Sequence, residues 1–80
     1  MPVHTVLSPL PGTFYRRPSP DQAAFKEVGD AVAVGDTIGL IEVMKSFSPV
    51  SAEAAGRIAV FHVEDDDAVM PGQPLVDIDT

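Results

Sequence analysis

The sequence predicts a small all-β sandwich or barrel. In 80 residues there are 8 prolines and 6 glycines, and they interrupt every window that could form a long helix. Short runs rich in Val, Ile and Phe lie between them, a spacing typical of small β-sheet domains. The chain also repeats itself, so we expect a flattened sandwich of two quasi-symmetric four-stranded halves. Residues 1–80 would form one domain with a modest core.

The strand predictions follow the apolar runs between turn-forming residues. The first run is Val3–Leu7, the longest is Thr37–Val43, and a further strand begins at Ser46. The remaining runs are 13–15, 57–63 and 75–78. The predicted core residues are Val32, Ile38, Leu40, Ile41, Ile58, Val60, Val69, Leu75 and Ile78.

An internal repeat relates the two halves. Residues 30–35 match residues 67–72, each beginning Asp-Ala-Val and ending in Gly, as in a short strand that leads into a tight turn. Upstream, 12–14 resembles 56–58, but at a larger spacing, so the first half carries seven extra residues.

The extra residues fall in a proline-rich segment, 17–24. Ser19, Pro20 and Gln22 imitate a helix start. The repeat, however, aligns 25–27 with the end of the run 57–63. We therefore expect a stiff loop at 17–24 and a strand at 25–27.

The composition of the chain excludes several classes of partner and of chemistry. With 12 acidic residues against 5 Lys plus Arg, the net charge of −7 argues against nucleic acid as a partner. There are no cysteines for disulfides or thiolate chemistry, and no apolar stretch is long enough to cross a membrane. No signal peptide is expected either. We expect a protein of the cytoplasm, or of a plastid or other organelle if a transit segment has been removed.

The segment Glu42-Val43-Met44-Lys45 is the main candidate site. It ends one strand run just before another begins, at the junction of the two halves. The repeat therefore places Lys45 at a hairpin tip, with the chain termini at the opposite end. An exposed amine there is accessible to a modifying enzyme and suits the attachment of a prosthetic group. A merely solvated turn lysine is the alternative, and a bare Met-Lys pair does not decide between them.

Other candidate sites are weaker. His4 and His62 lack paired ligand spacing, and the run Asp65-Asp66-Asp67 lacks the ligand spacing of a calcium loop, which predicts a solvated turn. No Ser-His-Asp or Cys-His set is present. We expect neither a catalytic residue nor a metal site.

Taken together, the motifs resemble the biotinyl domain of biotin carboxyl carrier proteins of the acetyl-CoA carboxylase type. The resemblance covers about residues 7–79. It rests on the tetrapeptide ending in Lys45, on Gly-Thr-Phe-Tyr-Arg at 12–16 followed by Pro-Ser-Pro-Asp at 18–21, and on the stretch 28–36. In that family the second motif leads into a protruding thumb loop. Val43 and Ser46 stand where the family usually has Ala and Met. Since few residues precede the resemblance, we expect an excised domain or a short free-standing carrier.

The resemblance implies a non-catalytic carrier. A biotin protein ligase would join biotin to Lys45 through an amide. Biotin carboxylase, using ATP and bicarbonate, would carboxylate the tethered biotin, and a carboxyltransferase would form malonyl-CoA from acetyl-CoA for fatty acid synthesis. The tether keeps the carried group at high effective concentration. The implied recognition residues are Glu42, Val43, Met44 and Ser46, with Pro18, Ser19 and Pro20 in the thumb.

Two alternatives remain open from the sequence. A lipoyl carrier domain of a 2-oxo acid dehydrogenase complex shares the fold and the lysine turn. Lipoyl domains usually have Asp before the lysine and Ala after it, where this chain has Met44 and Ser46. The other alternative is a biotinyl-like interaction module in which Lys45 is never modified. Glu42 has a similarly plain alternative as a solvated strand end.

Overall fold

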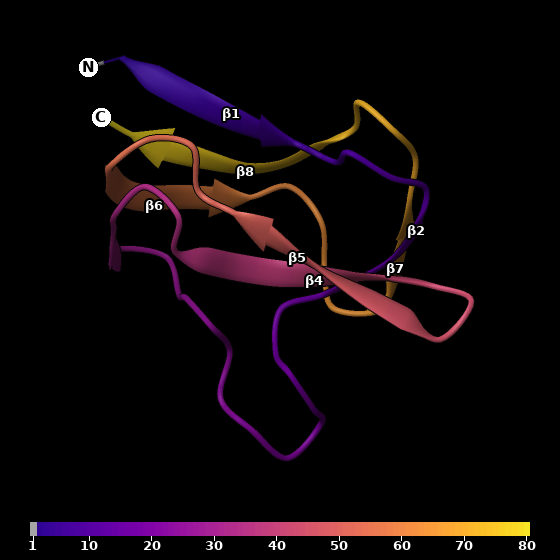
Figure 1. Ribbon diagram of the computed structural model, residues 1–80. Coiled ribbons are helices and arrows are strands. Elements are labelled where there is room, and N and C mark those ends of the chain that lie inside the picture. The colour runs from indigo at the N-terminus through magenta and orange to yellow at the C-terminus, as the bar shows by residue number, and fades with distance from the viewer. Residues whose placement is uncertain (1) are drawn as a thin grey trace.

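The computed structural model describes residues 2–80, which form strands joined by turns and loops (Figure 1). The strands make two four-stranded antiparallel sheets, ordered β1-β8-β6-β3 and β5-β4-β2-β7. Their bounds are β1 Val3–Leu7, β2 Gly12–Tyr15, β3 Ala31–Val32, β4 Thr37–Val43, β5 Ser46–Ser51, β6 Gly56–Phe61, β7 Asp67–Val69 and β8 Pro74–Asp79. The predicted all-β fold is confirmed. Across residues 2–80, no helix has the length and apolar character needed to span a membrane.

The two halves of the chain are interleaved. Each sheet takes two strands from β1–β4 and two from β5–β8. Moving every strand label by four converts one sheet order into the other, which is the quasi-twofold arrangement expected from the repeat. Because β1 pairs with β8 and β5 with β4, neither half completes a sheet without the other.

Equivalent turns in the two halves make equivalent hydrogen bonds. The N–H of Gly35 donates to the carbonyl of Ala52 at 2.8 Å, and the N–H of Gly72 donates to the carbonyl of Ser8 at 2.8 Å. Both glycines have positive φ, 93° and 82°, a conformation that glycine adopts at little cost. Ala52 and Ser8 are both buried, so each turn is fixed against the interior.

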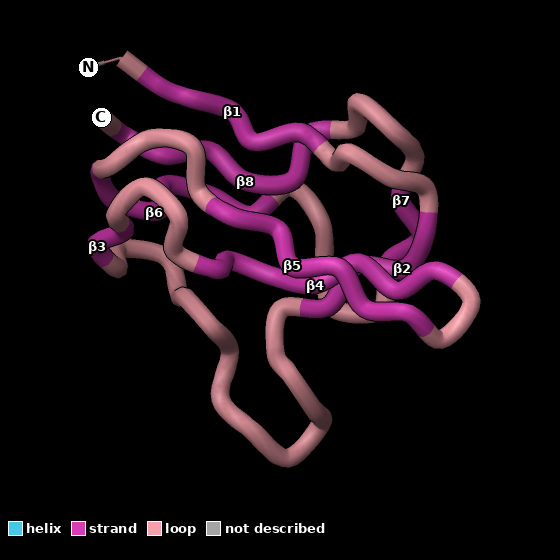
Figure 2. Tube along the Cα trace, viewed as in Figure 1, coloured by secondary structure: helices cyan, strands magenta, loops and turns pink. Residues whose placement is uncertain are grey.

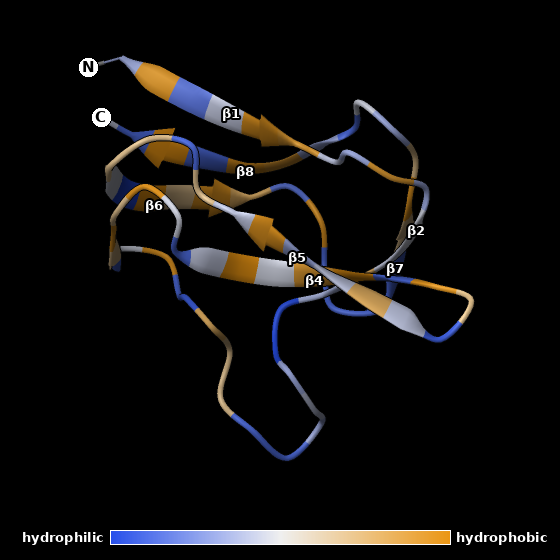
Figure 3. Cartoon of the chain, viewed as in Figure 1, coloured by the Kyte–Doolittle hydropathy of each residue, from blue (hydrophilic) through white to orange (hydrophobic). Residues whose placement is uncertain are grey.

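The inner faces of both sheets enclose one apolar core. Figure 3 shows the hydrophobic residues of the strands as orange bands. Seven of the nine predicted core residues are buried, but Leu40 is half-buried and Val60 is 40% exposed. In both strands a register irregularity precedes these positions, and it turns the next side chain outward. The buried apolar residues are Val6, Phe14, Val32, Ile38, Ile41, Val50, Ala52, Ile58, Val63, Val69, Leu75, Val76 and Ile78.

Residues 25–27 are not a strand, contrary to the sequence prediction. Their counterpart is also irregular, since β6 ends at Phe61 rather than at residue 63. In both places an aspartate three residues ahead accepts the backbone N–H: Asp30 that of Glu27 at 2.9 Å, and Asp67 that of Glu64 at 2.8 Å. A side-chain acceptor thus takes the donor that a sheet ladder would need.

The loop between β2 and β3 is the longest connection in the described chain. It runs from residue 16 to residue 30 and projects away from the sandwich (Figure 2). The second half joins the equivalent strands, β6 and β7, with a much shorter loop, residues 62–66. The predicted loop at 17–24 lies within this projection, and we call residues 17–24 the thumb.

Candidate functional site

Lys45 lies at the tip of a tight hairpin between β4 and β5. Val43 pairs with Ser46 across the hairpin, which leaves Met44 and Lys45 as the turn. Both have positive φ, 50° and 67°, as in a type I′ hairpin turn. The hairpin lies at one end of the molecule and the chain termini lie at the other (Figure 1). Side chains other than Gly, Asn and Asp are uncommon in this conformation, so a Met-Lys turn is an outlier that points to function.

The chain's two lysines have different surroundings. The Nζ of Lys26 donates to the carbonyl of Ala31 at 3.2 Å and lies 3.5 Å from the Oδ2 of Asp36, and its side chain is only 24% exposed. Lys45 is exposed at the turn. Lys45 is therefore the more accessible amine.

The flanking residues differ in exposure. Met44 is 93% exposed, Ser46 is exposed, and Val43 is partly buried against the core. Glu42 is half-buried, and its Oε1 accepts a hydrogen bond of 3.1 Å from the Tyr15 hydroxyl. Glu42 is therefore more than a solvated strand end. This hydrogen bond, more than burial and the charges of Glu42 and Asp66, raises the pKa of Tyr15.

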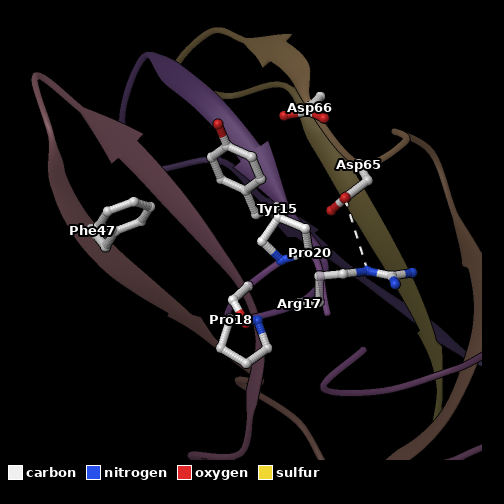
Figure 4. A pocket seen from close by; sticks show the side chains of 8 residues that line it. Tyr15, Arg17, Pro18, Pro20, Phe47, Asp65 and Asp66 are labelled. Carbon is white, nitrogen blue, oxygen red and sulfur yellow. Dashed lines mark ion pairs between the residues drawn. The ribbon is translucent and has the colours of Figure 1, made fainter. Parts of the chain in front are cut away.

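A cleft lies between the thumb and the start of β5. Its volume is about 340 Å³, and Figure 4 shows the side chains that line it. Phe47, the second residue after Lys45, forms part of its wall, with its ring centroid 6.1 Å from that of Tyr15. The thumb residues predicted from the family motif meet in this one cleft. The lining residues are Tyr15, Arg17, Pro18, Ser19, Pro20, Phe47, Asp65 and Asp66.

The thumb has its own internal structure. The N–H of Gln22 donates to the carbonyl of Ser19 at 3.1 Å, and the Ser19 hydroxyl donates to Asp21 at 2.7 Å. That hydroxyl lowers the pKa of Asp21. Pro18 and Pro20 restrict the backbone further. The thumb is thus a stiff loop beside the Lys45 hairpin.

The cleft also contains residues that the sequence did not single out as site residues. In the sequence Tyr15 is one residue of the motif at 12–16, and Phe47 lies outside every motif. The segment 65–67 was predicted to be a solvated turn, and a turn does form at 65–66. The Asp65 side chain, however, is only 36% exposed and contacts the base of the thumb. One feature of the sequence pointed to Asp65: the internal repeat has Val28 at the equivalent position of the first half.

Comparison with known proteins identifies the family. The family model described as "biotin-requiring enzyme" matches residues 4–78. The chain belongs to this family. Its Haemophilus influenzae relative, "Biotin carboxyl carrier protein of acetyl-CoA carboxylase", is 43% identical over 76 residues, which are 95% of this chain and 49% of that protein. A Pseudomonas aeruginosa relative of the same name is 43% identical, over 94% of this chain and 48% of that protein.

Two further comparisons match this chain to a smaller part of a longer protein. A chloroplastic relative from Glycine max, also named for the carrier of acetyl-CoA carboxylase, is 40% identical over 85% of this chain and 26% of its own length. The crystal structure of Kluyveromyces lactis urea carboxylase has a TM-score of 0.77 and 28% identity, covering 98% of this chain and 6% of that one. The chain thus spans about half the length of the bacterial relatives and corresponds to one part of larger proteins.

Proposed function

We propose that Lys45 carries covalently attached biotin and that the domain is a non-catalytic carboxyl carrier of acetyl-CoA carboxylase. The observation that carries this proposal is the exposed lysine in a left-handed turn at a hairpin tip, in a chain of the biotin-requiring family. The residues present fit a tethered group, since the amine is accessible and a cleft with aromatic walls begins two residues further on.

The chain's own residues would present the attachment site to other proteins. A biotin protein ligase would recognise the exposed Met44 and the carboxylate of Glu42, which Tyr15 orients. Ser46 and Val43 would set the spacing of the hairpin around Lys45. When bound, biotin would carry the carboxyl group from biotin carboxylase to carboxyltransferase, with acetyl-CoA as acceptor. Because chloroplastic and bacterial relatives share this region, we propose the cytoplasm or a plastid as its location.

Intact mass tests the attachment. After co-expression with a biotin ligase and biotin, the protein should gain the mass of one biotinyl group. Co-expression with a lipoyl ligase and lipoate provides the control and should leave the mass unchanged. A lipoyl adduct, or no adduct with either ligase, would contradict the proposal in favour of a lipoyl domain or an unmodified interaction module.

We further propose that Pro18, Ser19 and Pro20, which line the cleft beside Phe47, contribute to carboxyl transfer, and a thumb deletion tests this. The N–H of Phe25 already donates to the carbonyl of Arg16 at 2.9 Å, so a short turn can replace residues 17–24 between these two. We expect the fold and the biotinylation of Lys45 to persist, because the second half closes without such a loop. Carboxyl transfer to acetyl-CoA in the reconstituted complex should fall. An unchanged rate of transfer would show that the thumb is a surface loop with no role in carboxyl transfer.

A further inference from the structure

Arg16, the residue immediately before the thumb, is held by several contacts. Its backbone N–H donates to the Oδ1 of Asp65 at 2.7 Å. Its guanidinium lies 4.1 Å from the ring centroid of Phe61 and donates to the Oε1 of Glu27 at 3.1 Å. Its carbonyl accepts from Phe25. The two ends of the loop are therefore hydrogen-bonded to each other, and Arg16 is also bound to residues of the second half of the chain.

Asp65 contacts both residues at the base of the thumb. Besides accepting the Arg16 N–H, its carboxylate lies 3.9 Å from the Nε of Arg17 (Figure 4). A hydrogen bond from a backbone N–H to a carboxylate is charge-assisted and stronger than one between neutral groups. The next residues, Pro18 to Pro20, form the wall of the cleft, so the position of Asp65 sets where that wall begins.

The first half of the chain shows the same turn without this carboxylate. Val28 occupies the position equivalent to Asp65 and is 61% exposed, and its side chain cannot accept a hydrogen bond. The residues that follow, Gly29 and Asp66, both have positive φ, 94° and 72°. Both donate their N–H to a strand carbonyl at 2.8 Å. The turn therefore forms whether its two central residues are Val-Gly or Asp-Asp, and the carboxylate at the first of these positions is present only in the turn that faces the thumb.

We infer that Asp65 is a positioning residue that fixes the angle of the thumb, residues 17–24, relative to the hairpin that bears Lys45. The functional part of this inference rests on the proposed function, because the angle matters to transfer only if Lys45 carries a group beside the thumb. The structural part does not depend on any modification of Lys45.

Amide hydrogen exchange on the unmodified protein tests the structural part. In Asp65→Ala the Arg16 amide should exchange about tenfold faster than in the wild type, since a hydrogen bond to a charged acceptor is lost. The core amides of Phe14 and Ile41 should keep their rates, which shows that the variant is folded. Asp65→Asn retains an acceptor oxygen and should restore most of the protection. Glu53→Ala is the matched control, because that carboxylate pairs with His4 instead. An unchanged Arg16 amide in Asp65→Ala would overturn the inference.

Transfer kinetics on fully biotinylated protein test the functional part. Carboxyl transfer to acetyl-CoA should fall several-fold in Asp65→Ala, recover in Asp65→Asn and stay at the wild-type rate in Glu53→Ala. Faster exchange of Arg16 with unchanged transfer would overturn the positioning role. If the wild type accepts no biotin at all, the proposed function fails, whereas the exchange result on the unmodified chain still decides whether Asp65 holds the thumb.

Discussion

Asp36 in the first half and Gln73 in the second occupy equivalent turns. The Oδ2 of Asp36 accepts the N–H of Ala33 at 2.9 Å, and the Oε1 of Gln73 accepts the N–H of Met70 at 3.0 Å. One acceptor is charged and the other neutral, yet the turns close alike. The turn at this position therefore closes on a side-chain oxygen whether or not that oxygen carries a charge.

Other differences between the halves lie around the cleft that the thumb shares with Phe47, the second residue after Lys45. The thumb is inserted only in the first half, and Asp65 replaces the equivalent of Val28 only where it meets that thumb. The hairpin turn itself corresponds, under the quasi-twofold, to the place where the chain termini lie. The comparison teaches that positions alike in both halves hold the fold, whereas unlike positions near Lys45 build the candidate site.

The largest expected effect concerns the shared core. Ile41 and Ile78 are equivalent in the repeat and are both fully buried. Truncating either to Ala should lower the free energy of unfolding by about 2–5 kcal/mol, because buried methyl groups are lost and a cavity remains. Urea denaturation should show similar losses for the two variants. A severe loss in one half with almost none in the other would break the twofold account.

Equivalent glycines provide a second comparison. A Cβ on Gly12 would meet the carbonyl oxygen of Glu42, and a Cβ on Gly56 would meet that of Asp79. Since backbone atoms must shift in both cases, Gly12→Ala and Gly56→Ala should each cost about 1–3 kcal/mol of unfolding free energy. Thermal and urea unfolding measure this. Tolerance of alanine at either site would show that the strands are less closely packed there.

The smallest expected effect is a pH dependence. The N–H of Ala33, and then Lys26, lower the pKa of Asp36 in the folded state. A lowered folded-state pKa stabilises the fold above the ordinary aspartate value of about 3.9, and this contribution is lost as pH falls through the lowered value. Acid unfolding should therefore be less steep in Asp36→Asn than in the wild type.

Gln73→Glu makes the reciprocal change. It places a carboxylate beside the Met70 N–H, so acid unfolding should become steeper than in the wild type. Circular dichroism between about pH 2 and pH 6 follows the unfolding of all three proteins. If the wild type and both variants were equally sensitive to acid, the carboxylate in this turn would not be a source of the pH dependence.

Local patterns predicted the regular parts of the fold, and the repeat predicted the place of Lys45. Strands β1 and β4 match the predicted runs in both bounds, because alternating apolar runs between turn residues are a local signal. Leu40 and Val60 were misplaced because a register irregularity in each strand leaves no clear mark in the sequence. The prediction of a strand at 25–27 was wrong because Asp30 accepts the backbone N–H of Glu27, which a β-ladder would need as a donor.

The contacts around the thumb could not be predicted from the sequence. Asp65 meets Arg16 across 49 positions, and no local pattern reports a contact at that separation. Tyr15 likewise reaches Glu42 from a neighbouring strand, 27 positions away. Only the departure of Asp65 from its repeat partner Val28 hinted that the acid has a role beyond the turn.

Peptide mapping after co-expression with biotin ligase and biotin tests the central claim most directly. Lys45 is exposed at the hairpin tip, whereas Lys26 is held by Ala31 and Asp36. We predict one biotinyl group on the peptide that contains Lys45, full labelling of Lys26→Arg, and no labelling of Lys45→Arg. Biotin that persists in Lys45→Arg, or that maps to Lys26, would contradict the account.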